Sequence, residues 1–191
     1  MKLLLHICCA PCLIYPSGKL KAKGVSFTGF FFNPNIHTFS EYNKRKKTLE
    51  DFSRPADIQI IYGEYIPMEF FEAVRAKEDK PQRCRICFSL RLKKTAQAAK
   101  KEGLNAFSTT LLVSPYQDHE ALKEIGGRVA QEEGIDFYYE DFRPGFKEAQ
   151  NAARAQGLYR QKFCGCVYSE IERYKNKALR INAASATNKV P

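Results

Sequence analysis

The 191-residue chain has no run of apolar residues that approaches the roughly 20 needed for a membrane-spanning helix. Its N-terminus resembles a signal peptide only faintly, because Pro11 and Cys12 stand where a small-residue cleavage site would be expected. Internal repeats and domain linkers are also missing. We therefore expect a cytoplasmic protein without a membrane partner. A single domain should cover residues 1–180, followed by a disordered tail at 181–191.

The composition is that of a folded globular protein, with 44% hydrophobic and 27% charged residues. The charge is unbalanced, since 31 Lys and Arg against 21 Asp and Glu give a formal net charge of +10. This excess favours a polyanionic partner, because each phosphate that a cation neutralises releases condensed counterions. A general solubility charge is the alternative explanation.

Short apolar or β-branched segments alternate with segments of helical pattern, and Gly24, Gly103 and Gly134 end three of the predicted helices. We expect strands at 2–7, 25–32, 57–62, 106–112 and 136–139. Helices should cover 13–23, 41–52 (after an N-cap at Ser40), 67–77, 85–101, 118–133 and much of the chain beyond. The pattern predicts an α/β domain with a mostly parallel, doubly wound Rossmann-like sheet and a helical C-terminal part.

Four conspicuous segments directly follow predicted strands. In an open α/β sheet, ligands bind beyond the carboxyl ends of the strands. We therefore expect these segments to converge on one rim of the sheet. They are residues 8–12, 33–37, 114–118 and 141–145.

Six of the seven cysteines lie in three short motifs: the adjacent pair Cys8-Cys9, the CxxC of Cys84 and Cys87, and the CxC of Cys164 and Cys166. Clustered cysteines in a cytosolic chain indicate metal or redox chemistry rather than a disulfide scaffold. A helix start at Cys84 would lower the thiol pKa values there. The CxC could form a strained, reducible disulfide or a second ligand pair.

Spacing alone does not separate zinc from iron, because both zinc and iron–sulfur clusters take four thiolates. Buried thiols without a metal remain an alternative for Cys8 and Cys9, and a zinc knuckle remains one for Cys164 and Cys166. Seven sulfurs exceed one zinc site, and this surplus favours electron transfer.

Several other residues are candidates for the same rim. His6 is expected to be a core or supporting group, with ligation to a metal as the alternative. Asp118 is expected to cap its helix, and catalysis is the alternative. His37, Tyr116 and His119 lie at loop or helix-start positions on the rim.

Basic residues recur in two runs, Lys44 to Lys47 and Arg83 to Lys94, and a solvated helix face is their usual explanation. Because Arg83 and Arg85 flank the CxxC, we expect these two to contact substrate phosphate. Arg160 belongs to the segment 159–162, which precedes the CxC and could clamp a nucleotide.

Five motifs together resemble the cobalamin-independent epoxyqueuosine reductase family. In chain order they are His6-Ile7-Cys8-Cys9-Ala10-Pro11-Cys12, Asn33-Pro34-Asn35-Ile36-His37, Arg83-Cys84-Arg85-Ile86-Cys87, residues 108–116 and Phe163-Cys164-Gly165-Cys166. The resemblance covers nearly the whole chain except the tail, and the ordered combination is highly specific.

The resemblance implies an oxidoreductase that reduces epoxyqueuosine to queuosine at the wobble position of tRNA, in the last step of that modification. It implies a fold like the nucleotide-binding (HUP-type) domain of tRNA-thiolation enzymes. A [4Fe-4S] cluster would be held by Cys8, Cys9, Cys84 and Cys87, and Cys164 and Cys166 would form a redox-active pair. Cys12 has no assigned role; it could bind a second metal, such as an additional iron, or begin the helix.

The resemblance further implies binding of the tRNA anticodon stem-loop, for which Asn33, Asn35, His37, Arg83, Arg85 and Arg160 are our candidates, and an electron donor that the sequence does not identify. Asp118, His119 and Tyr116 are the candidates for the proton donor. Two other functions remain open: a zinc-stapled tRNA-binding module and a thiol-based sulfur carrier for tRNA thiolation. The sulfur carrier requires an ATP-binding loop, and no Ser-Gly-Gly-type loop follows the first strand.

Overall fold

The computed structural model describes the backbone of residues 1–187 and the side chains up to residue 179. Within this part of the chain, five parallel strands form one sheet in the order β3-β2-β1-β4-β5. The strands are β1 (Lys2–His6), β2 (Ser26–Phe31), β3 (Ile60–Tyr62), β4 (Ala106–Thr109) and β5 (Asp136–Phe137). Our prediction of a parallel, Rossmann-like α/β domain is confirmed.

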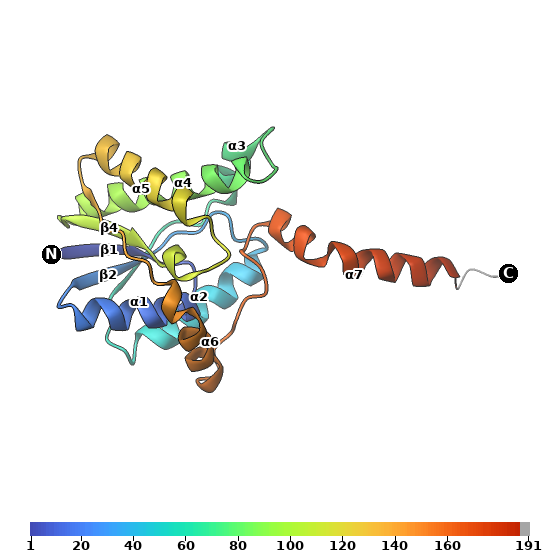
Figure 1. Cartoon of the computed structure of the whole chain (residues 1–191), viewed down its shortest axis with the longest axis horizontal. Helices are drawn as coiled ribbons and strands as arrows, with labels where there is room; N and C mark the ends of the chain where they lie inside the picture. Colours follow the sequence, from blue (N-terminus) through green and yellow to red (C-terminus); the bar gives the residue numbers. More distant parts are fainter. Residues whose placement is uncertain (188–191) are drawn as a thin grey trace.

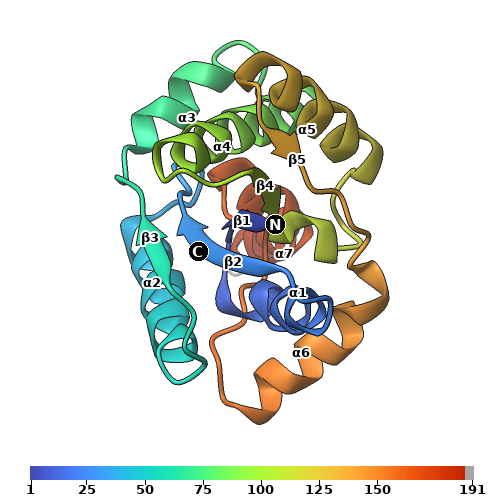
Figure 2. The ribbon, with the colours of Figure 1, turned by 90° about the vertical axis from the view of Figure 1, so that its left-hand side faces the viewer.

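Helices cover both faces of the sheet. They are α1 (Ala10–Ala22), α2 (Phe39–Ser53), α3 (Pro67–Val74), α4 (Gln82–Lys101), α5 (His119–Glu133), α6 (Phe146–Ala155) and α7 (Val167–Thr187). Figure 2 shows α1, α2 and α6 on one side of the strands and α3, α4 and α5 on the other. This arrangement explains the unbroken apolar run of β1, whose Leu3, Leu4 and Leu5 are completely buried, because a central parallel strand is covered on both faces.

Three helix starts differ from the prediction, at α1, α2 and α4, and the cap of α5 agrees with it; α4 begins at Gln82 rather than at 85. Helix α1 begins at Ala10 rather than at 13, because Pro11 fits the first turn of a helix; Cys12 therefore lies inside this turn. Thr38, not Ser40, is the N-cap residue of α2. Asp118 caps α5 as predicted, with Oδ1 accepting a 2.9 Å hydrogen bond from the Ala121 amide.

Helix α7 projects away from the rest of the molecule (Figure 1). Near its start, Glu172 forms ion pairs with Lys80 at 2.7 Å and with Arg83 at 2.6 Å. The helix includes residues 181–187 of the segment that we predicted as a disordered tail, and residues 188–191 of that segment lie outside the described residues. No helix in the described part of the chain is long and apolar enough to cross a membrane.

Candidate metal centre

Hydrogen bonds connect the segments that follow the strands at the carboxyl edge of the sheet. Asn33, after β2, donates from Nδ2 to the Ile7 carbonyl after β1 at 2.8 Å. The amide of Phe142 donates to the Leu112 carbonyl at 3.2 Å, so the segments after β5 and β4 also meet. These bonds join the ends of neighbouring strands in pairs, and the convergence of all four predicted segments on one rim stays a prediction.

Three thiols gather at the start of α1. The sulfur atoms of Cys8, Cys9 and Cys12 all lie within 4.8 Å of one another, and all three residues are buried. They come together because the chain turns from β1 into the helix, with Cys9 as its N-cap residue and Cys12 one turn further on. Gln161 reaches this group from the far end of the chain, with Nε2 at 2.9 Å from the Cys9 sulfur.

The thiol pKa values in this group diverge. Hydrogen bonds from Cys12 and Cys9 lower the pKa of Cys8 well below its usual range. Burial raises the pKa of Cys9, and the hydrogen bond with Cys8 raises that of Cys12. The group therefore holds one negative charge on Cys8 readily, whereas ionisation of all three thiols requires a positive charge among them.

The CxxC lies in the first two turns of α4. Positions three residues apart share one face of a helix, so Cys84 and Cys87 are neighbours. Cys87 is buried in a small apolar cluster with Phe70, Val74 and Cys166, and this burial raises the pKa of its thiol to about 12. The CxxC and the CxC therefore meet at this cluster.

Every carbonyl group of residues 163–166, the CxC loop, accepts a hydrogen bond. Arg45 donates to the carbonyls of Phe163 (3.3 Å) and Cys164 (2.9 Å). The His37 amide donates to Gly165 at 2.9 Å, and the Ser169 hydroxyl to Cys166 at 2.7 Å. The loop backbone is thus held on all sides, while the Cys164 side chain remains exposed.

Gly165 is required at the centre of this loop. Its φ of +140° is a conformation that other residues rarely adopt. An added Cβ would lie 3.0 Å from Cγ1 of Ile36 and 3.3 Å from Nη1 of Arg45. Close packing against α2 and the loop after β2 therefore depends on the missing side chain.

Arg45 is the centre of a buried network that sequence analysis missed. Its Nε donates to Oε1 of Glu41 at 2.7 Å, and the hydroxyl of Tyr159 donates to Oε2 of the same carboxylate at 2.5 Å. The Arg45 side chain is only 1% exposed. We predicted a solvated face for the run of residues 44–47, and this is wrong for Arg45. The salt-bridge spacing of Glu41 and Arg45 was the available signal.

Arg83 and Arg91 are also buried, so the solvated-face interpretation is wrong for them as well. Arg83 pairs with Glu172 and donates to the Glu78 carbonyl. Its predicted contact with substrate phosphate stays a prediction. In this structure the guanidinium of Arg83 connects α4 to α7 through its ion pair with Glu172.

The three histidines, His6, His37 and His119, are buried and neutral. His6 bonds Thr109 Oγ1 at 2.9 Å and the Phe32 carbonyl at 3.2 Å, and burial, with the charge of Arg91, lowers its pKa to about 4. His37 stacks on Phe71 with 4.4 Å between ring centroids, and burial lowers its pKa too. The supporting role predicted for His6 agrees with these contacts.

The segment after β4 carries the predicted proton donors and approaches the CxC loop through Gln117. Gln117 Nε2 lies 3.8 Å from the Cys164 sulfur. His119 bonds the Ser114 carbonyl at 3.2 Å through Nε2, while its buried Nδ1 has no hydrogen-bond partner. Tyr116 is 83% exposed, and Asp118 is occupied as the helix cap.

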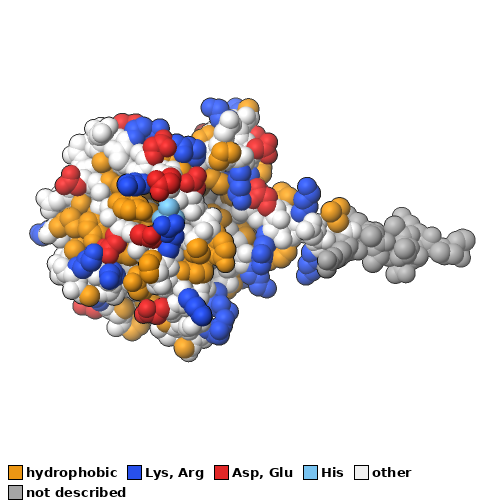
Figure 3. Space-filling model, viewed as in Figure 1, with side chains coloured by type: hydrophobic (Ala, Val, Ile, Leu, Met, Phe, Trp, Pro, Cys, Tyr) orange, Lys and Arg blue, Asp and Glu red, His pale blue; other side chains and the backbone are white. Residues whose placement is uncertain are grey.

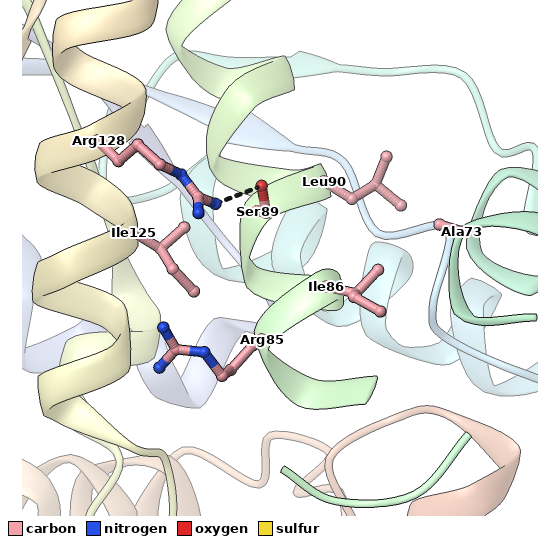
Figure 4. Close-up of a pocket in the computed structure, with 7 residues that line it drawn as sticks. All are labelled: Ala73, Arg85, Ile86, Ser89, Leu90, Ile125 and Arg128. Carbon is pink, nitrogen blue, oxygen red and sulfur yellow. Dashed lines mark hydrogen bonds between the residues drawn. The ribbon is translucent and has the colours of Figure 1, made fainter. Parts of the chain in front are cut away.

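Arg85 lines a hollow of about 390 Å³ between α3, α4 and α5 (Figure 4). It extends from α4 and pairs with Glu124 on α5, while Arg128 reaches back from α5 to Ser89. Both guanidinium groups therefore already have partners. Arg160, which we expected to help clamp a nucleotide, is exposed and precedes the CxC loop in the chain.

The residues present fit a metal held by sulfur. The thiols of Cys8, Cys9 and Cys12 lie within 4.8 Å of one another, and among the described residues Cys84 and Cys87 do not belong to a group of this kind. The buried Nη2 of Arg91 has no hydrogen-bond partner and is suited to an anion beside it. The ligand set of Cys8, Cys9, Cys84 and Cys87 that the resemblance implies stays a prediction, and sequence analysis did not predict that Cys12 joins Cys8 and Cys9.

Comparison with known proteins gives a consistent result. A family model described as epoxyqueuosine reductase QueH matches residues 3–172. Curated proteins with this description include one from Dehalococcoides mccartyi, 38% identical over 91% of this chain and 94% of its own length. The protein from Thermotoga maritima is 36% identical over 92% of this chain and 93% of its own length. That from Histophilus somni is 35% identical over 88% and 72%, respectively.

Proposed function

The chain belongs to the epoxyqueuosine reductase QueH family, and from this we infer that it is an oxidoreductase that reduces epoxyqueuosine to queuosine at the wobble position of tRNA. The observation that carries the proposal is the group of buried thiols of Cys8, Cys9 and Cys12 after β1, together with the packing of Cys87 against Cys166 in a second cluster. A zinc-stapled binding module would not need the exposed Cys164 beside the buried thiols.

The reaction fixes what the site must supply. Both carbon–oxygen bonds of the epoxide break, a carbon–carbon double bond forms, and the oxygen leaves as water. This balance needs two electrons and two protons. A dithiol that closes to a disulfide releases two electrons and two protons, so the pair of Cys164 and Cys166 could serve one epoxide in each oxidation.

We assign Cys8, Cys9, Cys84 and Cys87 as the residues that would hold a [4Fe-4S] cluster, with Cys12 available for an additional iron. Such a cluster would supply single-electron transfer and Lewis acidity towards the epoxide oxygen. The chain itself excludes water from this region, because Cys8, Cys9, Cys12 and Cys87 are all buried.

A proton donor must reach the departing oxygen. We propose Tyr116 for this role, because its side chain is the most accessible of the three candidates and belongs to the segment that approaches Cys164 through Gln117. His119 and Asp118 would position the segment, since one binds its backbone at Ser114 and the other caps α5.

The tRNA would approach the open side of the CxC loop. Arg160 and Lys162 are exposed immediately before this loop, and Arg173, Lys175 and Lys177 are exposed on α7 immediately after it. Figure 3 shows the cationic side chains along the described part of α7. We propose that these residues contact the phosphates of the anticodon stem-loop.

The test combines metal analysis with a product assay. Protein prepared without air should contain iron and acid-labile sulfide and absorb visible light. With a chemical reductant it should convert epoxyqueuosine in tRNA to queuosine, detected by mass spectrometry of the digested nucleosides. A colourless protein that holds only zinc would refute the cluster, and a loaded protein that leaves the epoxide intact would refute the reaction.

A further inference from the structure

Arg91 on α4 is a fully buried cation without a carboxylate. Its side chain is 1% exposed and lies one helical turn beyond Cys87. Nε donates to the Cys87 carbonyl at 3.3 Å, and Nη2 has no partner. Among the described residues, no Asp or Glu lies within 4.0 Å of it, whereas the two other buried arginines pair with Glu41 and Glu172.

Such a group is costly to bury. A guanidinium cannot lose its proton at physiological pH, so the protein cannot neutralise it as it could a lysine or a histidine. An unpaired charge in the interior costs several kcal/mol in general. Arg91 therefore requires an anion that is not a carboxylate.

Cysteine thiols are the acidic groups whose charges act on Arg91. Burial works against the charge of Arg91, yet its pKa is raised because the potential thiolates of Cys87, Cys164 and Cys8 attract the guanidinium. These residues come from α4, the CxC loop and the end of β1, and the one printed contact of Arg91 is that of its Nε with the carbonyl of Cys87. His6 also lies near it and is neutral.

We propose that Arg91 is the internal counter-ion of the sulfur-bound cluster and that its charge raises the reduction potential of that cluster. The inference rests on the proposed function. A thiolate-ligated cluster becomes more negative when it accepts an electron, and a fixed cation in a low-dielectric interior stabilises that state. The potential would then be set by a residue that is neither a ligand nor in contact with the substrate.

This role predicts unequal effects in the two forms of the protein. Without the cluster the guanidinium has mostly neutral thiols around it, so Arg91→Met should change the thermal unfolding midpoint of the apo protein only slightly. With the cluster bound, the same substitution removes an attraction and should lower the midpoint. If Arg91 were purely structural, the substitution would instead lower the unfolding midpoint of both forms equally.

The experiment compares the wild-type protein with Arg91→Met, Arg91→Lys and Lys93→Met. Lys93→Met removes a half-exposed cation from the same helix and controls for net charge. Potentials are measured by anaerobic redox titration of the loaded proteins, and midpoints are measured for apo and loaded forms. Arg91→Met should disfavour one-electron reduction at least about tenfold, which corresponds to about 59 mV to the negative side. Arg91→Lys and Lys93→Met should stay close to the wild type.

Two results would overturn the inference: a wild-type potential in Arg91→Met, or equal destabilisation of its apo and loaded forms. Arg91→Met could also keep the apo fold but fail to bind the cluster, while Arg91→Lys still binds it. This result would support the inference as well, because it shows that the cluster needs the positive charge at position 91. Failure of the proposed function looks different, because the wild type itself would then lack the cluster or leave the epoxide unreduced.

Discussion

Arg45 donates a hydrogen bond of 2.9 Å to the carbonyl oxygen of Cys164, a residue 119 positions later in the chain. The same guanidinium binds Glu41, which in turn accepts from Tyr159. The CxC loop is therefore attached to α2 by a buried ion pair rather than by apolar packing alone. Because the loop carries Cys164 outward and Cys166 inward, this attachment fixes which sulfur is accessible.

Arg45→Met should loosen the CxC loop. It leaves the Glu41 carboxylate buried without its cation, and breaking such a pair costs about 3–5 kcal/mol in free energy of unfolding. Turnover should fall about a hundredfold, because small displacements of reacting groups are costly. Urea denaturation and the nucleoside assay measure the two effects. Lys46→Met, next along the helix, is the matched control and should change neither by much. Equal losses in both variants would contradict the role of Arg45.

Gly165→Ala should destabilise the protein, and Gly127→Ala should not. At position 165 the φ of +140° and the contact with Ile36 oppose a Cβ, so we expect a loss of about 1–3 kcal/mol in stability together with reduced turnover. Gly127 lies in α5 with no atom within 4 Å of the added Cβ, and alanine there should stabilise the helix by about 0.5–1 kcal/mol. Thermal unfolding of the two variants checks the opposite signs.

Stability should fall as the pH drops below about 6.5, the ordinary pKa of histidine. All three histidines have lowered pKa values in the folded protein because they are buried. Below this pH the unfolded chain therefore binds more protons than the folded chain, and the free energy of unfolding decreases. His6, with a pKa of about 4, alone should account for about 2 kcal/mol between pH 7 and pH 5.

Urea unfolding of the reduced apo protein across this range measures the slope. Glu140, Asp141 and Glu172 have lowered pKa values and titrate below the window, so they contribute little to it. His6→Gln should flatten the curve, because an amide does not titrate. An unchanged slope in this variant would show that His6 is not the group responsible.

Serine substitutions separate cluster ligands from the extra thiol. Cys9→Ser should remove at least half of the iron and sulfide, since a [4Fe-4S] cluster needs four thiolates. Cys12→Ser should retain them, because Cys8, Cys9, Cys84 and Cys87 already supply that number. Both substitutions are equally conservative and affect the same buried thiol group. If both variants lost the same amount of iron and sulfide, Cys12 would be a cluster ligand, and one of the two CxxC cysteines would not be.

The fold was largely predictable because its signals are local. The apolar run of β1 and the glycine after α5 each reflect neighbours in sequence, as does the capping residue Asp118. The boundaries were less accurate where local preferences compete. Helix α1 begins at the cysteines because Pro11 is compatible with a first turn, and β4 ends at Thr109 because the chain tightens into a 3-10 turn.

The interior charges were not predictable in this way. Arg45 and Arg91 look like members of exposed basic runs, and only tertiary contacts distinguish them from their neighbours Lys46 and Lys93. Likewise, the approach of Gln161 to Cys9 joins positions 152 residues apart. Such pairings depend on how distant segments pack, which neither periodicity nor composition encodes.

The order of the sheet also has a consequence for biosynthesis. The first four strands in the sequence, β1 to β4, together with Cys8, Cys9, Cys84 and Cys87, leave the ribosome before Gln161 and the CxC loop are made. Domains fold as units while synthesis proceeds from the N-terminus. The growing chain can thus assemble most of the sheet and present these four thiols while the CxC loop is still untranslated, and under the proposed cluster-binding role this is when a metal donor has its widest access.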